Sequence, residues 1–306
     1  MVFQTPLILD GGFATELENS FHKDLSGKLW SAKCLDEDPY AIKAVHRMYF
    51  EAGADIATTC SYQASVKGFL DAGYSYAKAI ELMRRSVQLA REARDEFGRG
   101  LVALSIGCYG AVLANGAEYT GDYGENVGPK ELLQFHKERL AVFLQEPGID
   151  FVLFETIPSL AEAKAIRDLV ADSALPLPPL AISFSCQSND QIADGTPLDT
   201  VLALFDSLEQ VFAVGVNCTK IRLIPSLLSN VAKHATLSGK TLLCYPDGGA
   251  EWDAVARSWK EESKLSSEAF ARTVDKDIKP FGKNVIVGGC CGTGPAHIQC
   301  LRRLIS

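Results

Sequence analysis

The regular alternation of short apolar runs with segments of helical periodicity limits the possible folds of this chain most strongly. Eight such runs follow one another, and each ends in glycine or polar residues. The predicted strands are Pro6–Asp10, Ala54–Cys60, Leu101–Ile106, Asp150–Glu155, Leu180–Ser185, Ala213–Cys218, Thr241–Tyr245 and Asn284–Gly289. Strand–helix alternation eight times over predicts an α/β fold of the closed (β/α)8 type, the TIM barrel. A doubly wound open sheet is the rival, but it does not need eight units.

The segments between the runs carry apolar stripes at helical spacing. Asp38 followed by Pro39 is typical of an N-cap and a proline at the first helical position, and the stripe that follows ends at Gly53. Another stripe lies in Ser159–Ala171, and Pro295 begins the last predicted helix. These helices are the crossovers that parallel strands require.

The length and composition fit one large domain. A chain of 306 residues is usual for a single (β/α)8 barrel, and no internal repeat or linker divides residues 1–306. A hydrophobic content of 47% is ample for a sizeable core. The net charge of −8 argues against a nucleic acid or an anionic membrane as partner, because neither gains from an acidic surface.

The cysteine content predicts a reducing compartment. Nine cysteines are an odd number, and they are scattered along the chain rather than arranged as a dense disulfide framework. The N-terminal segment has no basic region, and no signal peptide, transit peptide or membrane span is predicted. We therefore expect a cytoplasmic protein.

Three strand-to-helix connections are longer than a barrel needs, namely Gly11–Asp38, Gly107–Pro129 and Pro246–Ser267. Long loops in compact domains usually bind something or are disordered. These loops contain six large aromatic residues, Trp30, Tyr109, Tyr119, Tyr123, Trp252 and Trp259, which favours binding.

Three cysteines stand at predicted strand ends. Cys218 ends the sixth run, and Cys290 and Cys291 follow the eighth. The C-terminal ends of barrel strands carry the chemistry, and three thiolates form a Zn²⁺ shell that leaves a fourth position open. Two other interpretations remain at this point. Free cysteines are often small buried hydrophobes, and the adjacent pair can form a strained vicinal disulfide. No CxxC or HExxH signature decides between them. For the other six cysteines, Cys34, Cys60, Cys108, Cys186, Cys244 and Cys300, we favour burial.

Two acidic residues also stand at strand ends. Asp10 and Gly11 close the first run, and Glu155 closes the fourth. Taken singly, Asp10 is expected to be a turn or cap residue and Glu155 a partner in a salt bridge at the rim. Together with the cysteines, however, they would face one cavity. An acidic pair beside a thiolate shell suits a ligand that has both an ammonium group and a thiol.

The chain also resembles the homocysteine S-methyltransferase family, in the branch that uses S-methylmethionine or S-adenosylmethionine as methyl donor. The resemblance covers nearly the whole chain. Nine motifs carry it in order: LDGGFATELE (Leu9–Glu18), LWSAK (Leu29–Lys33), SYQAS (Ser61–Ser65), SIGCYGA (Ser105–Ala111), EYTGDY (Glu118–Tyr123), FETIP (Phe154–Pro158), DGTPL (Asp194–Leu198), GVNC (Gly215–Cys218) and GGCCGT (Gly288–Thr293).

The resemblance implies an enzyme that moves a methyl group to the thiol of L-homocysteine to give methionine, with Zn²⁺ as its cofactor. It implies that Cys218, Cys290 and Cys291 hold the zinc. Asp10, Gly11 and Glu155 would hold the amino-acid end of homocysteine, and Trp30 and Tyr62 would face the methyl donor. The resemblance leaves open whether the chain is a monomer or a homodimer.

Two residues depart from or extend the family pattern. Cys108 stands where relatives commonly have proline, and Cys60 directly precedes SYQAS as a fourth thiol beside the site. One helix follows Cys291 in this sequence, so we expect neither the C-terminal extension of the betaine-using relatives nor a cobalamin or folate module.

Two function classes compete with the methyltransferase. The first is a barrel with a structural zinc that serves as a binding or scaffold protein. The second is a zinc-dependent hydrolase, whose metal site typically uses histidine and carboxylate ligands. The five histidines, His22, His46, His136, His234 and His297, lie far apart, and none stands at a predicted strand end.

Overall fold

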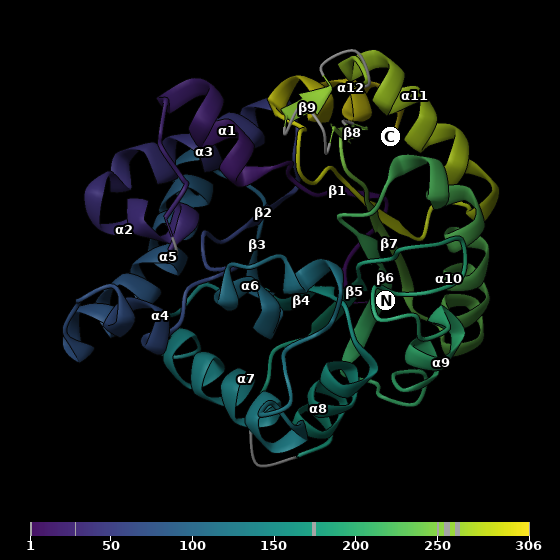
Figure 1. The fold of residues 1–306 in the computed structure, drawn as a ribbon. Helices are drawn as coiled ribbons and strands as arrows, with labels where there is room; N and C mark the ends of the chain where they lie inside the picture. Colours follow the sequence, from purple (N-terminus) through teal and green to yellow (C-terminus); the bar gives the residue numbers. More distant parts are fainter. Residues whose placement is uncertain are drawn as a thin grey trace.

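The protein is described by a computed structural model over residues 2–27, 29–172, 176–249, 251–253, 258–260 and 264–305. Eight parallel strands form its centre, and helices surround them (Figure 1). The strands are β1 (Leu7–Ile8), β2 (Ile56–Thr58), β3 (Leu101–Gly107), β4 (Phe151–Ile157), β5 (Leu180–Phe184), β6 (Val211–Asn217), β7 (Thr241–Tyr245) and β10 (Val285–Val287). Each matches one predicted run, so the alternation in the sequence indicated the correct architecture.

The sheet closes on itself. Its hydrogen-bonded order is β1-β10-β7-β6-β5-β4-β3-β2, and a parallel bridge between Leu9 and Ile56 joins the two outer strands. The Asp55 amide donates to the Ile8 carbonyl at 2.7 Å, and the Asp10 amide donates to the Ile56 carbonyl at 3.0 Å. The predicted (β/α)8 barrel is therefore confirmed, and the doubly wound alternative is wrong.

The helices α3, α8 and α12 lie where the sequence signals predicted helices. Asp38 caps the third helix by accepting from the Ala41 amide at 3.0 Å, and Gly53 ends it with a φ of 108°. The helices are α1 (Phe13–Phe21), α2 (Cys34–Glu37), α3 (Pro39–Ala52), α4 (Val66–Asp71), α5 (Tyr76–Phe97), α6 (Tyr109–Leu113), α7 (Pro129–Phe143), α8 (Leu160–Ala171), α9 (Leu198–Ala203), α10 (Ile224–Ser238), α11 (Ser267–Ile278) and α12 (Pro295–Leu304). Over the described residues, no helix combines the length and the apolar character that crossing a membrane requires.

The barrel interior is filled and its N-terminal end is closed. Leu153, Ala181 and Leu243 belong to a buried cluster that is separate from the larger core shared with the helices. At the N-terminal ends of the strands, the Phe3 ring packs on Phe151 and Phe212, with ring centroids 5.7 and 5.2 Å apart. The Phe3 ring therefore covers the barrel end opposite to the C-terminal ends of the strands.

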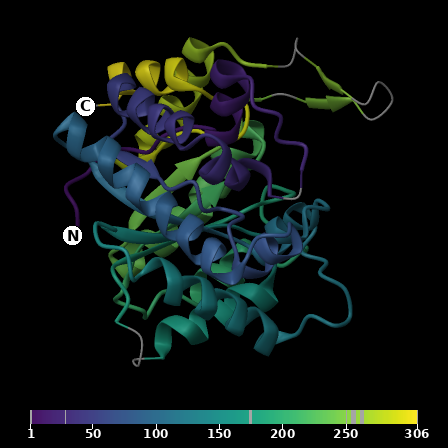
Figure 2. The ribbon, with the colours of Figure 1, turned by 90° about the vertical axis from the view of Figure 1, so that its left-hand side faces the viewer.

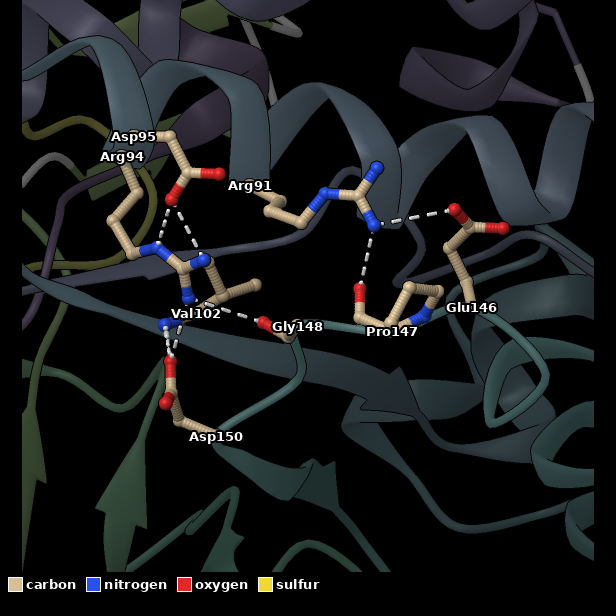
Figure 3. A network of polar contacts seen from close by, with 8 residues as sticks. All are labelled: Arg91, Arg94, Asp95, Val102, Glu146, Pro147, Gly148 and Asp150. Atoms are coloured by element: carbon tan, nitrogen blue, oxygen red, sulfur yellow. Dashed lines mark hydrogen bonds and ion pairs between the residues drawn. The ribbon is translucent and has the colours of Figure 1, made fainter.

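Charged groups tie α5 to the loop before β4 (Figure 3). Arg91 donates to the Pro147 carbonyl at 3.0 Å, and Arg94 pairs with Asp150 at 3.3 Å. Asp150 also accepts from the Val102 amide at 2.7 Å, which connects this network to the start of β3. The network lies on the N-terminal side of the barrel. Residues on this side usually stabilise the fold, whereas the chemistry takes place at the opposite end.

The three long connections are only partly irregular. The first contains α1, the 3₁₀ turn η1 (Trp30–Lys33) and α2, and the second contains α6 and the 3₁₀ turn η2 (Ala117–Tyr119). The third forms an antiparallel hairpin of β8 (Glu251–Asp253) and β9 (Ser258–Lys260), which projects from the barrel in Figure 2. Trp252 and Trp259 pair across this hairpin, but their side chains lie outside what the structure describes.

Candidate metal and substrate site

One pocket at the C-terminal ends of the strands contains every residue that the sequence analysis assigned to the site. The strand ends β1, β4, β6 and β10 contribute to it, together with the loops after β1 and β2. The predicted residues that line it are Asp10, Gly11, Trp30, Tyr62, Glu155, Cys218, Cys290 and Cys291. The eight positions span most of the chain, and the closed barrel brings them together.

Three thiols form a compact triangle on the pocket wall. The sulfur atoms of Cys218, Cys290 and Cys291 all lie within 4.8 Å of one another, and the Cys218 and Cys291 sulfurs are 3.6 Å apart. All three cysteines are free and only partly buried. Backbone bonds fix two of them, because the Cys218 amide donates to the Tyr245 carbonyl and the Cys290 amide to the Pro246 carbonyl.

Glycines allow the two loops that carry the site to pack closely. A Cβ atom on Gly12 would lie 2.7 Å from the Cys290 carbonyl oxygen, and one on Gly289 would lie 2.3 Å from Thr293 Oγ1. Thr293 Oγ1 instead accepts from the Gly12 amide at 3.1 Å and donates to the Cys290 carbonyl at 2.7 Å. The glycine pairs in LDGGFATELE and GGCCGT therefore allow Cys290 to lie against the end of β1.

The thiol cluster fits a soft metal ion. The neighbouring thiols of Cys218 and Cys290 donate toward the Cys291 sulfur, and this lowers the pKa of Cys291 well below its usual value. The same contacts raise the pKa of Cys290, because the cluster stabilises one thiolate more easily than several. Three mutually close sulfurs that open on a pocket satisfy the ligand preference of zinc and leave one side free.

Glu155 lies at the end of β4 in a network of hydroxyl groups. Its carboxylate accepts from Ser105 Oγ and, at 3.1 Å, from Tyr245 Oη. Burial raises the pKa of Glu155 to about 7, although both hydroxyl donors oppose the shift. No ion pair involving Glu155 is found among the described residues, so the rim salt bridge expected for it taken singly is wrong.

Asp10 lies on the adjacent wall and joins β1 to β2. Its Oδ2 accepts from the Thr58 amide at 2.7 Å, and Thr58 Oγ1 lies within 3.1 Å of both carboxylate oxygens. The side chain is almost completely buried, and this burial raises its pKa well above the usual value. Asp10 thus connects the ends of β1 and β2 and borders the pocket, and it is neither the turn residue nor the helix cap expected for it taken singly.

The aromatic pair forms another part of the wall. Trp30 and Tyr62 meet edge to face with ring centroids 6.4 Å apart, and both are partly buried. Tyr62 lies over Gly107, where a Cβ atom would be 2.6 Å from the tyrosine ring and from its carbonyl oxygen. The glycine in SIGCYGA therefore makes room for one ring of the pair.

The pocket has a consistent electrostatic character. Its lining includes the carboxyl groups of Asp10, Glu118 and Glu155 and the three thiols. Among the described residues that line it there is no lysine, arginine or histidine. An acidic, thiol-rich and partly aromatic wall favours ligands that carry positive charge.

The comparisons with known proteins agree with this arrangement. The family model for homocysteine S-methyltransferase matches residues 7–305. Homocysteine S-methyltransferase 2 of Zea mays is 40% identical over 98% of this chain and 90% of its own length. The chain belongs to the homocysteine S-methyltransferase family.

Two further members of this family are similar in sequence and in structure. Homocysteine S-methyltransferase YbgG of Bacillus subtilis (strain 168) is 40% identical over 96% of this chain and 92% of its own. The crystal structure of the metallated homocysteine methyltransferase MmuM of Escherichia coli superposes with a TM-score of 0.83 at 35% identity, covering 98% of this chain and 96% of that one. The chain is thus an enzyme of this family.

The two cysteines that depart from the homocysteine S-methyltransferase pattern lie in different places. Cys60 lines the pocket, and its thiol points to the Ser31 carbonyl at 3.6 Å. Burial raises the pKa of Cys60 to about 12, so it remains a thiol at neutral pH. Cys108 is buried before α6 with a φ of −65°, a value that proline also adopts.

Sequence reasoning noted Tyr119 only as an aromatic residue of a long loop, and it assigned neither Tyr119 nor Glu118 of the second long connection to the pocket, which both line. Tyr119 Oη lies 3.6 Å from Cys218 Sγ, and Glu118 precedes it in η2. Burial raises the pKa of Glu118. The signal was present in the motif EYTGDY, but neither periodicity nor spacing shows which side chain of a long loop turns inward.

A buried arginine that was also missed supports the aromatic wall. Arg139 of α7 donates to the carbonyl groups of Ser61, Tyr62, Ala64 and Gly107 at 2.7–3.0 Å. Burial lowers its pKa to about 10, so it still carries its charge at neutral pH. Arg139 therefore fixes the loop that presents Tyr62.

Proposed function

We propose that this enzyme transfers a methyl group from a sulfonium compound, S-methylmethionine or S-adenosylmethionine, to the thiol of homocysteine at a zinc ion. Cys218, Cys290 and Cys291 would hold the zinc. The observation that supports the proposal most is the triangle of thiols, within 4.8 Å of one another, on the wall of an otherwise acidic and aromatic pocket. The family supplies homocysteine as acceptor.

The metal accounts for the reactivity of the acceptor. A free thiol has a pKa of about 8.5, so most of a homocysteine pool is protonated at neutral pH. Bound in this cluster, Zn²⁺ would keep the substrate sulfur deprotonated and nucleophilic. The three cysteines would make this site electron-rich, because three thiolates already outweigh the charge of the ion.

The β1 and β4 ends would orient homocysteine. Asp10 and Glu155 provide carboxylates that can accept from its ammonium group. Helix α1 begins at Phe13 beside the same pocket, and a helix N-terminus favours a carboxylate. The amino-acid end would therefore lie between these groups while the thiol reaches the cysteine cluster.

The aromatic wall would receive the methyl donor. A sulfonium cation over the ring of Trp30 or Tyr62 gains about 1–2 kcal/mol where water is excluded. With the metal bound, no group of the protein would have to remove a proton during methyl transfer, because the thiol of homocysteine would already be deprotonated. Most of the acceleration would come from aligning donor and acceptor. A compact cation needs only this wall, so we expect S-methylmethionine to be used at least as well as S-adenosylmethionine.

A hydrolase explains the pocket less well. Hydrolytic zinc sites use histidine and carboxylate ligands that keep a water molecule acidic, and the described pocket wall has no histidine. A purely structural zinc explains neither the open side of the thiol triangle nor the adjacent carboxylates.

A turnover assay with metal analysis tests the proposal. Purified enzyme is incubated with homocysteine and S-methylmethionine, S-adenosylmethionine or betaine, and methionine is measured together with bound zinc. We expect turnover with a sulfonium donor and one zinc per chain. Cys290→Ala should lose both, whereas Cys300→Ala, at a buried thiol outside the pocket, should lose neither. Full activity in metal-free Cys290→Ala protein would contradict the proposal.

A further inference from the structure

The pocket contains a third carboxyl group that homocysteine does not need. Asp10 and Glu155 have hydrogen-bond donors from the protein, which fix them at the ends of β1 and β4. Glu118 differs from both. Its Oε2 is buried, and the described residues offer it no hydrogen-bond partner. A buried carboxylate oxygen without a donor is costly, so this oxygen is prepared for a donor that comes with a ligand.

The position of Glu118 is well fixed. Ser185 Oγ at the end of β5 donates to the Glu118 carbonyl at 3.1 Å, and the Gly121 amide closes the turn onto Ala117 at 2.8 Å. Gly110 packs so closely that a Cβ atom there would lie 2.6 Å from the Glu118 amide nitrogen. The side chain is thus presented by a supported backbone.

A buried residue of α8 holds both ends of this connection. Glu162 is completely buried and accepts from the Tyr109 amide at 2.7 Å and from Tyr123 Oη. His136 Nε2 contacts the same carboxyl group at 2.8 Å. Because Tyr109 precedes η2 and Tyr123 follows it, Glu162 fixes the segment that carries Glu118 over the pocket.

Glu118 lines the same pocket as the aromatic pair Trp30 and Tyr62. The next residue in η2, Tyr119, reaches Cys218 Sγ at 3.6 Å. Tyr62 of the aromatic pair borders the same pocket. A methyl donor that places its sulfonium on the aromatic wall and its methyl group toward the thiols would have its remaining atoms near η2.

We infer that Glu118 binds the ammonium group of the methyl donor, an inference that rests on the proposed methyl transfer from a sulfonium amino acid. The chemistry of the two cations assigns their places. An ammonium group offers N–H donors, and Glu118 Oε2 has no hydrogen-bond donor among the described residues. A sulfonium has none and is better stabilised by an aromatic face. S-methylmethionine and S-adenosylmethionine share this amino-acid end, so Glu118 would recognise both.

Glu118→Gln tests this inference, because it removes the charge and keeps the shape. The Michaelis constant for S-methylmethionine should rise roughly ten- to a hundredfold, as for a lost hydrogen bond between charged groups, while homocysteine affinity and zinc content stay unchanged. Dimethylsulfonioacetate, a sulfonium without an ammonium group, serves as a competitor of S-methylmethionine. Its inhibition constant should be the same in the variant and in the unaltered enzyme.

Glu125→Gln is the matched control, because Glu125 lies exposed on the same connection outside the pocket. It should behave as the unaltered enzyme does. An unchanged constant for S-methylmethionine in active Glu118→Gln enzyme would overturn the inference. An equal loss of affinity for dimethylsulfonioacetate, or for homocysteine, would overturn it as well.

If the unaltered enzyme turns over no sulfonium donor, the proposed function fails instead, and calorimetry with S-methylmethionine then tests whether Glu118 binds this compound. The inference about Glu118 would be refuted if the unaltered and Glu118→Gln proteins bind S-methylmethionine with equal affinity, or if neither binds it.

Discussion

Glu155 should make the binding of the amino-acid end depend on pH. Burial raises its pKa to about 7 in the ligand-free enzyme, so the carboxyl group is largely protonated below that pH. The protonated form cannot pair with an ammonium group, and binding must then release a proton. Affinity should therefore fall as the pH decreases through 7.

The size of the effect follows from this value. With a pKa of about 7, a tenth of the carboxyl groups are ionised at pH ~6 and nine tenths at pH ~8, so affinity should differ roughly tenfold. Homocysteine is unsuitable for the measurement, because its own thiol titrates at higher pH. Methionine, the expected product, has the same ammonium group and no group that titrates between pH ~5 and ~8.5.

Calorimetric titration with methionine across this range, at fixed zinc loading, provides the test. Unaltered enzyme should lose about tenfold in affinity from pH ~8 to ~6 and release a proton on binding, whereas Glu155→Gln should bind weakly at every pH. Glu209→Gln, at an exposed position, is the control. The folded-state pKa is raised from its usual value of 4.5 to about 7, so ionisation of Glu155 destabilises the fold as the pH rises between these two values. The variant should accordingly gain stability relative to unaltered protein over that interval. A pH-independent affinity in unaltered enzyme would refute the reasoning.

Three further predictions concern other parts of the site. Peroxide should release zinc and inactivate the enzyme, and a thiol reductant with added Zn²⁺ should restore activity while oxidation stops at the disulfide. Inactivation with zinc still bound would contradict this prediction. Trp30→Ala should raise the Michaelis constant for the donor or lower kcat, with little effect on homocysteine binding, as steady-state kinetics would show. Arg139→Lys should lower the free energy of unfolding in urea by about 2–4 kcal/mol, because an ammonium has three donors and cannot serve four carbonyl groups. A loss below ~1 kcal/mol would contradict this role.

The apolar runs predicted the barrel because parallel strands buried on both faces must be apolar throughout. Some strand ends differ from the prediction. The run Pro6–Asp10 forms only a two-residue strand, β1. Beyond it, the Asp10 side chain rather than the backbone takes the Thr58 amide. A side chain that replaces a ladder bond leaves no trace in hydrophobic periodicity.

The thiols and carboxylates could be predicted because they end strands, and the barrel fixes where strand ends meet. The supporting residues could not. Arg139, His136 and Glu162 lie on helices, where a polar residue ordinarily faces water. Their burial shows only in the structure, although His136 and Arg139 share the apolar face of α7 with Leu132 and Leu140. A polar residue on the apolar side of a predicted helix therefore indicates a buried supporting residue of this kind.

Backbone strain gathers at the pocket and explains part of the network around it. Five non-glycine residues of the described chain have positive φ, and Trp30, Thr156 and Cys218 among them line the pocket. Such conformations cost about 1–3 kcal/mol each. Asn217 offsets the cost at Thr156 by accepting from its amide and donating to its hydroxyl, both at 2.8 Å.

The same asparagine connects this strained residue to the carboxyl group of the site. Asn217 Oδ1 also accepts from Ser183 Oγ, which contacts Tyr245 Oη, and Tyr245 donates to Glu155. Asn217 directly precedes Cys218, so one side chain supports the turn after Glu155 while its backbone leads into a cysteine of the thiol triangle. The distance between the amino-acid anchor and the thiols is thus set by a continuous hydrogen-bonded layer across β4, β5, β6 and β7. A ligand that spans them, with an ammonium at one end and sulfur at the other, meets a site whose two ends cannot shift independently.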